Sequence, residues 1–322
     1  MDEFGLIRHY FAAAPCAQAA TGVALGIGDD CALLDLALGE QLAISTDTLV
    51  AGVHFPAACD PYLLGQRGLA VAASDLAAMG ATPLAFTLAL TLPAATPEWL
   101  QGFAHGLNHM AQGCGLALIG GDTTRGPLSL TVTVFGRVPA GQALRRSGAQ
   151  VGDLLCVGGA LGDGAGALPL VLGQRRVAAE LAAPLLARYW SPQPQLALGQ
   201  ALRGKATAAL DISDGLLADC GHIATASKLA LRIELERLPL SPALLALLDK
   251  TAAQQCALSG GDDYVLAFTL PAAHLPALQA AGWPVVVIGQ ARAGSGVQLV
   301  DGQGITINPP ARGYQHFGST GD

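Results

Sequence analysis

The placement of the aspartates constrains the fold of this chain most strongly. In seven places an apolar segment is followed by glycine or a small polar residue and then by aspartate, and these junctions hold ten of the 24 acidic residues. Such junctions are typical of loops at strand ends, so we expect these acids at loop junctions without basic partners. They are Gly28-Asp29-Asp30, Thr46-Asp47, Ser74-Asp75, Gly121-Asp122, Gly162-Asp163, Asp211-Ile212-Ser213-Asp214 and Gly261-Asp262-Asp263.

Charge and length limit the class of protein. A chain of 322 residues is long enough for two domains with substantial cores. Only 13% of its residues are charged, and its net charge of -7 argues against nucleic-acid binding, which requires a basic surface. The acidic start is unlike a secretory signal, and one glycine and three prolines interrupt the uncharged stretch between Asp75 and Glu98. We therefore expect neither nucleic acid nor membrane as a partner.

The cysteines indicate a reducing compartment. All seven are scattered singly, without a Cys-x-x-Cys pair that would bind zinc. An odd number of isolated cysteines favours free thiols over a disulfide framework. We expect a cytoplasmic protein.

The first half of the chain has the pattern of an α+β unit. Asp60 and Thr96 each precede a proline, the usual arrangement of an N-cap and the first helical position. The first helix is expected to stop at Gly80, and the second at Gly113 and Gly115. Residues 128–138 alternate between apolar and polar, as in a half-buried strand. Strands are predicted at 42–46, 84–92, 116–120 and 128–138.

A turn-rich, polar segment from Pro139 to Gly152 separates this unit from a second one. We therefore predict an N-terminal domain at 1–140 and a C-terminal α/β domain at 141–322. In the second domain a helix is expected from Asp214 onward. Strands are predicted at 154–157, 264–270 and 285–288, and residues 210–213 are expected to end a further strand.

Clustered carboxylates indicate bound cations, because they repel one another unless a cation lies among them. Aspartates beside hydroxyls and backbone carbonyls are the oxygen ligands that Mg2+ prefers. The alternative for any single site is a turn or helix-cap residue, and Asp214 in particular could cap its helix. The double acids and the two Gly-Gly-Asp elements favour a metal site for the whole set. The Gly-x-x-x-x-Gly-Lys-Ser/Thr phosphate-binding motif is absent from the sequence.

Together these segments resemble the thiamine-monophosphate kinase family, in the superfamily that includes aminoimidazole ribonucleotide synthetase and selenophosphate synthetase. The resemblance runs nearly end to end. The Val53-His54-Phe55 and Ser259-Gly260-Gly261 elements point to the kinase. The most specific stretches of the resemblance are residues 25–32, 45–55, 74–81, 120–126, 211–216 and 259–264.

The resemblance implies a homodimer in which the N-terminal sheets of two subunits close into a barrel, and a phosphoryl transfer from ATP to thiamine monophosphate. The family usually has glutamate at the position of Asp262 and an acid at that of Val265. Among the roles that the resemblance implies, the contact of Asp262 with the thiamine part therefore departs most from the family pattern. The resemblance implies Mg2+ on Asp30, Ser45, Thr46, Asp47, Asp75, Asp122, Asp211 and Asp214, ATP on Gly121, Asp122, Arg146 and Ser213, and thiamine phosphate on His54, Asp262 and Tyr314.

Three of these residues also have ordinary structural readings. Arg146 could be a solvated surface cation, His54 a structural histidine, and Tyr314 an anchor for the C-terminal segment. The acceptor phosphate is already an anion near neutral pH, because a phosphate monoester loses its second proton at about pH 6. No general base is therefore expected. The rival functions are another enzyme of the superfamily and a regulator that binds nucleotide without turnover.

Overall fold

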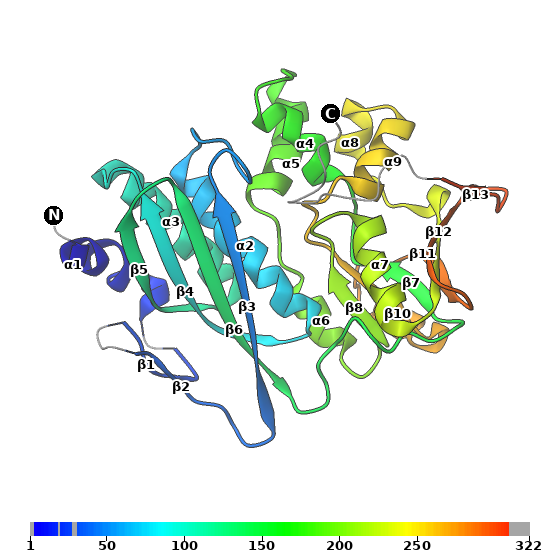
Figure 1. Cartoon of the computed structure of the whole chain (residues 1–322), viewed down its shortest axis with the longest axis horizontal. Helices are drawn as coiled ribbons and strands as arrows, with labels where there is room; N and C mark the ends of the chain where they lie inside the picture. The colour runs from blue at the N-terminus through cyan, green and yellow to red at the C-terminus, as the bar shows by residue number, and fades with distance from the viewer. Residues whose placement is uncertain (1–2, 19, 28–30, 309–322) are drawn as a thin grey trace. The chain divides into compact units, whose positions relative to one another are not determined.

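A computed structural model describes residues 3–18, 20–27 and 31–308 (Figure 1). The chain divides into two compact units. The first runs to Ala143 and also includes Trp190–Leu196, whereas the second consists of Leu144–Tyr189 and the chain from Ala197 onward. The chain thus returns briefly to the first unit between α5 (Ala179–Trp190) and α6 (Leu196–Leu202).

The first unit is built on a four-stranded sheet with the order β3-β6-β4-β5. The pairs β3-β6 and β6-β4 are antiparallel and β4-β5 is parallel, so β3 and β5 are the edge strands. All four strands were predicted, although β3 and β5 are longer than expected. The strands are β3 (Glu40–Val50), β4 (Thr82–Leu92), β5 (Ala117–Arg125) and β6 (Ser129–Pro139), and β1 (Val23–Leu25) pairs separately with β2 (Leu33–Leu34).

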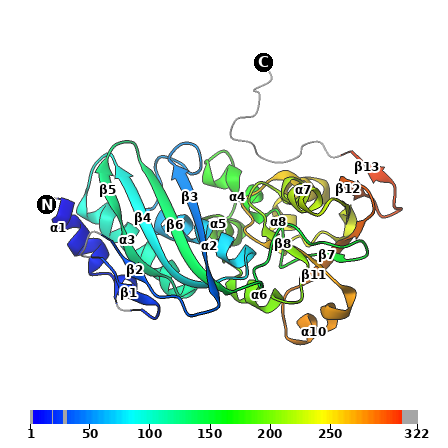
Figure 2. The same ribbon diagram turned by 60° about the horizontal axis from the view of Figure 1, so that its bottom comes forward.

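Two long helices, α2 (Pro61–Ala78) and α3 (Pro97–Cys114), lie together on one face of this sheet (Figures 1 and 2). The alternation predicted for β6 is confirmed, since Leu130, Val132 and Val134 are buried between partly exposed neighbours. Leu130, Val132 and Val134 therefore point to the helix-covered face, and the opposite face, toward which Thr131 and Thr133 point, is called the open face.

The helix start signals are confirmed. The Asp60 side chain accepts a hydrogen bond of 2.8 Å from the backbone N–H of Tyr62, and Pro61 begins α2. Gly115, with φ 67°, ends α3, whereas Gly113 lies inside that helix. Three short helical segments precede β1 in the chain: α1 (Glu3–Leu6), the π-helix η1 (Ile7–Ala12) and the 3-10 helix η2 (Pro15–Ala17).

Glycine lets α2 and α3 pack closely. A methyl group on Gly106 would lie 1.9 Å from the backbone oxygen of Tyr62, and one on Gly65 would lie 2.4 Å from that of Phe103. Only hydrogen fits at these two positions. The close approach fixes α2, the helix that carries Asp75, against α3.

The second unit contains a seven-stranded sheet with the order β13-β12-β9-β11-β7-β10-β8. All its neighbouring strands are antiparallel except β12 and β9, which run parallel. The strands predicted at 154–157, 264–270 and 285–288 are present, and the strand predicted to end at Ser213 is present but ends at Asp211. The strands of this sheet are β7 (Leu154–Val157), β8 (Ala208–Asp211), β9 (Ala230–Glu234), β10 (Leu266–Leu270), β11 (Val286–Arg292), β12 (Gly296–Val300) and β13 (Thr306–Ile307).

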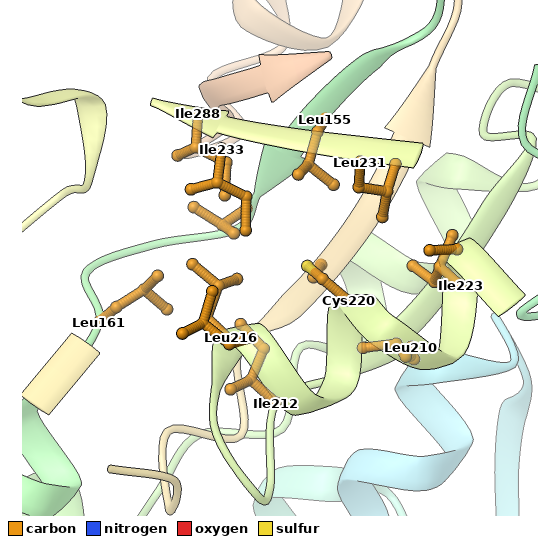
Figure 3. Packing of buried hydrophobic residues seen from close by; sticks show 14 of the residues in the cluster. Leu155, Leu161, Leu210, Ile212, Leu216, Cys220, Ile223, Leu231, Ile233 and Ile288 are labelled. Atoms are coloured by element: carbon orange, nitrogen blue, oxygen red, sulfur yellow. The ribbon is translucent and has the colours of Figure 1, made fainter. Parts of the chain in front are cut away.

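One side of this sheet packs on α7 (Leu216–Ser227) to form the core of the unit (Figure 3). Leu216, Cys220 and Ile223 of the helix point toward Leu155 and Leu231 of the strands, and all five are at most 4% exposed. The remaining helices are α4 (Asp163–Val171), α8 (Pro242–Leu247), α9 (Lys250–Ser259), α10 (Leu275–Ala280) and the 3-10 turns η3 (Leu235–Arg237) and η4 (Ala272–His274).

Two expectations about the environment can be compared with the described residues. All seven cysteines are described and none forms a disulfide, as predicted. Among the helices of the described part, none combines the length and the apolar character needed to cross a bilayer.

Candidate active site

The first part of the site is a group of oxygen ligands on β3 and α2. The Ser45 hydroxyl donates a hydrogen bond to Oδ2 of Asp75. Ser45 and Asp47 are two residues apart on one strand, so both side chains point to the helix-covered face. The structure therefore joins the Ser45 hydroxyl to a carboxylate 30 residues away in the sequence, and it places Asp47 on the same face of the strand as Ser45.

Thr46 points the other way. Its hydroxyl shares a hydrogen bond of 2.9 Å with that of Thr133 on the open face, where Thr48 pairs in the same manner with Thr131. Asp122 also belongs to the open face, because the register aligns it with the exposed Ala89. The two faces of the sheet thus divide the predicted ligands of the first unit.

The expectation that these acids lie at loop junctions is wrong for Asp47, Asp75 and Asp122. Asp47 and Asp122 lie inside β3 and β5, and Asp75 lies in the last turns of α2. For the two strands the reason is that pairing continues past the small residues: β3 remains paired with β6 as far as Val50, and β5 with β4 as far as Arg125. For Asp75 the reason is that α2 continues to Ala78. Asp163 also departs from the expectation, because it has a basic partner, with its Oδ2 3.8 Å from Nε of Arg188.

Gly121 is a position that only glycine can occupy. Its φ is 149°, and a methyl group there would lie 1.9 Å from the Leu88 carbonyl oxygen. One row of the sheet runs from Asp47 through Val132 and Leu88 to Gly121. Three strand spacings separate its ends, about 14 Å.

A cavity of about 630 Å³ borders this end of the sheet. Its walls are largely apolar, and Gly121, Asp122 and Arg8 contribute polar groups. Apolar walls with a few polar groups are typical of sites for small molecules. No local sequence pattern indicates the cavity. It is lined by Ile7, Arg8, Phe11, Ile27, Cys31, Ala32, Leu88, Leu118, Ile119, Gly120, Gly121, Asp122 and Thr123.

The oxygen ligands fit magnesium in their chemistry. Among the described residues, no group of three or more histidine, cysteine, aspartate or glutamate side chains is arranged to hold a metal ion. Mg2+ commonly uses only one or two protein carboxylates, and waters and substrate phosphates complete its shell. Ser45, Asp47 and Asp75 supply hard oxygen donors of this kind.

His54 is held by the end of β3. Its Nδ1 accepts a hydrogen bond of 3.0 Å from the backbone N–H of Val50. An accepting Nδ1 carries no proton, so Nε2 bears the proton of the neutral ring. His54 can therefore donate a hydrogen bond through Nε2.

In the second unit, one buried carboxylate organises the loop after β8. Oδ2 of Asp219 accepts hydrogen bonds of 3.1 Å from the backbone N–H groups of Ser213, Asp214 and Gly215. Asp219 is 4% exposed, and burial raises its pKa to about 6, with the charge of Asp214 adding to the rise and the three N–H groups opposing it. Gly215, and not Asp214, is the N-cap of α7, so Asp214 is not the cap of this helix.

Asp219 was missed at the level of sequence. An acid in the first turn that reaches back to the N-cap is a known helix signal and could have identified it.

Asp211 is the last residue of β8 and is 8% exposed. Asp211, Ser213 and Asp214 therefore lie on one strand end and the loop that follows it.

The Gly-Gly-Asp-Asp loop lies against the same segment. The backbone N–H of Asp262 donates to the Ser213 carbonyl at 2.9 Å. Both carboxylate oxygens of Asp263 lie 2.9 Å from the backbone nitrogen of Gly162, which donates to them. Desolvation raises the pKa of Asp263, and the charges of Asp163 and Asp262 add to the rise. The structure thus brings Ser213 and Asp262 together within the second unit.

Arg146 is exposed and lies beside β8. Its carbonyl oxygen accepts a hydrogen bond of 3.3 Å from the Ser227 hydroxyl, and Ala209 donates to the neighbouring carbonyl of Arg145. The backbone is therefore anchored while the guanidinium faces solvent. Asp30 and Tyr314 lie outside the described residues, so their roles stay predictions.

Two family models match the chain, the AIR synthase related protein N-terminal domain at 28–138 and its C-terminal domain at 150–302. The fold and the site define a two-domain protein of the AIR synthase-related class with mixed α/β content.

Closer relatives identify the family. The thiamine-monophosphate kinase of Salmonella typhimurium is 46% identical over 322 residues, which cover 98% of each chain. The crystal structure of that kinase from Stenotrophomonas maltophilia K279a has a TM-score of 0.82 at 46% identity, over 87% of this chain and 91% of the other. AaThiL, complexed with AMPPCP and TMP, has a TM-score of 0.79 at 28% identity, over 88% and 89%. The chain belongs to the thiamine-monophosphate kinase family.

Proposed function

We propose that the chain transfers the γ-phosphoryl group of ATP to the phosphate of thiamine monophosphate, giving thiamine diphosphate. The full-length similarity to kinases of this name supports the activity. The observation that carries the proposal is that one unit holds both the Ser45–Asp75 pair, with Asp47 on the same strand face as Ser45, and a cavity with Gly121 in its wall. The first supplies oxygen ligands for a cation, and the second supplies a glycine backbone that phosphate oxygens can approach.

The cavity beside β5 is the proposed site of the nucleoside. Its apolar walls suit a flat base, and the absence of a side chain at Gly121 lets phosphate oxygens approach the backbone closely. Asp122 borders the same cavity. In the second unit, Ser213 and the exposed Arg146 are the proposed further contacts for ATP.

Magnesium is the proposed cofactor, held by oxygens of Ser45, Asp47 and Asp75, with Asp30, Thr46, Asp122, Asp211 and Asp214 as the further ligands that the family resemblance implies. When bound, it would neutralise charge on the two phosphate-bearing substrates. The chain's own residues would then orient the substrates for an in-line transfer. Because the acceptor is already anionic, none of them is assigned as general base.

Thiamine monophosphate is the proposed partner of His54, Asp262 and Tyr314. The Nε2–H of His54 is a donor suited to the substrate phosphate, and the Asp262 carboxylate suits a cationic ring. Domains at 1–140 and 141–322 remain our proposed functional division.

We also propose that the enzyme is a cytoplasmic homodimer. Leu42 and Ile44, on the open face of edge strand β3, are 37% and 59% exposed, which suits a surface covered by a second copy. Seven free cysteines suit a reducing compartment. Sedimentation equilibrium tests the dimer: a single monomeric species at micromolar concentration would contradict it.

The activity is tested by incubating the protein with ATP, Mg2+ and thiamine monophosphate and separating the products. Thiamine diphosphate formed only in the presence of Mg2+ is the expected result. Bound ATP without transfer would indicate the regulator instead. Transfer only to another acceptor would indicate a sister enzyme of the superfamily.

A further inference from the structure

Two residues of the Gly-Gly-Asp-Asp loop have an unusual backbone. Asp262 has φ 60° and Tyr264 has φ 50°, in the left-handed region that side chains other than glycine rarely adopt. Such conformations cost free energy and persist only where the surrounding structure imposes them, often at functional sites. Because these two residues lie on either side of Asp263, the surrounding structure must hold the loop in one specific conformation.

Backbone hydrogen bonds hold this shape against the loop after β8. Asp262 N–H donates to the Ser213 carbonyl at 2.9 Å, and Tyr264 N–H donates to the Ile212 carbonyl at 2.8 Å. In return, Ile212 N–H donates to the carbonyl of Val265 at 2.9 Å. The strain is therefore maintained by three bonds to a single neighbouring segment.

The side chains of the loop divide between two tasks. Asp263 accepts from the backbone N–H of Gly162, which anchors the loop to the start of α4. The Tyr264 hydroxyl donates a hydrogen bond of 2.9 Å to Oδ1 of Asp262. Tyr264 is only 6% exposed, so its ring is fixed by packing and its hydroxyl is a rigidly placed donor.

The pairing matters because Asp262 has a short side chain. A carboxylate rotates with little preference about its last torsion, so a fixed donor selects one orientation. We propose that Tyr264 is a positioning residue for substrate specificity: its hydroxyl orients the Asp262 carboxylate toward the cationic ring of thiamine monophosphate. This inference rests on the proposed function, in which Asp262 contacts the thiamine part of the substrate.

A purely structural role would have a different signature. If the hydrogen bond served only to satisfy a buried hydroxyl, its loss would lower stability and affect both substrates alike. If it orients Asp262, its loss affects thiamine monophosphate and leaves ATP unaffected. The split between the two KM values therefore separates the two roles.

The experiment compares Tyr264→Phe, Asp262→Ala and the double variant with the wild type. For Tyr264→Phe we expect the KM for thiamine monophosphate to rise about tenfold, the effect of one hydrogen bond to a charged group. The KM for ATP should change less than about twofold on the same reasoning. The double variant should be no worse than Asp262→Ala, because the hydroxyl acts through that carboxylate.

Tyr189→Phe is the matched control, since Tyr189 is a buried tyrosine of the same unit, 1% exposed, in α5. It should leave both KM values unchanged. Phenylalanine fills the space of the tyrosine ring, so melting temperatures are expected to confirm that both variants fold.

The outcomes are distinct. An unchanged KM for thiamine monophosphate in Tyr264→Phe, together with a raised KM in Asp262→Ala, would overturn the positioning role and leave the kinase assignment intact. An unchanged KM in Asp262→Ala would remove the substrate contact and this inference with it. Absence of thiamine diphosphate formation by the wild type would instead overturn the proposed function.

Discussion

Replacing Asp219 by alanine tests how the loop that carries Ser213 and Asp214 is held. In the native protein one carboxylate oxygen accepts three backbone N–H groups at 3.1 Å. The Gly215 N–H is buried, and losing its acceptor costs about 1–3 kcal/mol. The other two are partly accessible and can bond to water, so each adds less than about 1 kcal/mol. We expect the free energy of unfolding to fall by about 2–4 kcal/mol.

The control is Asp249→Ala, which removes the aspartate at the N-cap of α9. Asp249 is exposed and accepts one bond of 2.9 Å, from the Ala252 N–H of α9, so its loss should cost about 1 kcal/mol. Urea unfolding followed by circular dichroism measures both variants, and hydrogen exchange of residues 212–216 reports the loop directly. A loss for Asp219→Ala no larger than for Asp249→Ala would refute the reasoning.

Three further predictions follow from other features. Ser45→Ala removes the hydrogen-bond donor to Asp75 and should raise the Mg2+ concentration for half-maximal activity several-fold. Thr48→Ala on the open face should leave that concentration unchanged. Equal effects of the two variants in a metal titration would contradict this. Gly121→Ala should abolish measurable ATP binding by calorimetry, because its methyl group would lie 1.9 Å from the Leu88 carbonyl oxygen, whereas Gly113→Ala, with open space, should bind normally. Burial raises the folded-state pKa of Asp219 to about 6, so the folded protein holds a proton that the unfolded chain releases above about pH 4. The free energy of unfolding should therefore fall as pH rises from about 4 to 6. In thermal denaturation Asp219→Asn should show a weaker dependence of stability on pH, and an equal dependence in both proteins would count against this.

Local signals were the ones that the sequence could predict. The caps at Asp60 and Pro61 and the alternation of β6 depend on neighbouring residues only, and both are confirmed. The strand alternation also holds for β3, where Ser45 and Asp47 share a face and Thr46 does not. A stricter use of that period would have separated Thr46 from the other two.

Features that depend on distant contacts were not predictable. The strand β3 continues past Thr46 because β6 pairs with it, which no local pattern indicates. Asp214 was an equally good cap from sequence, and only the fold shows Gly215 at that position with Asp219 reaching back. The contact between Ser45 and Asp75 joins a strand to a helix 30 residues away. These are tertiary effects that override local propensity.

The central claim is that oxygens of β3 and α2 bind a divalent ion together with the polyphosphate. It is tested most directly by electron paramagnetic resonance of Mn2+, as a substitute for Mg2+, titrated with ATP into the wild type, Asp47→Asn and Asp75→Asn. The account predicts that ATP-dependent Mn2+ binding weakens at least about tenfold in both variants, as expected when one charged ligand is lost, and remains unchanged in Asp249→Asn. Equal Mn2+ affinity in all four proteins would contradict it.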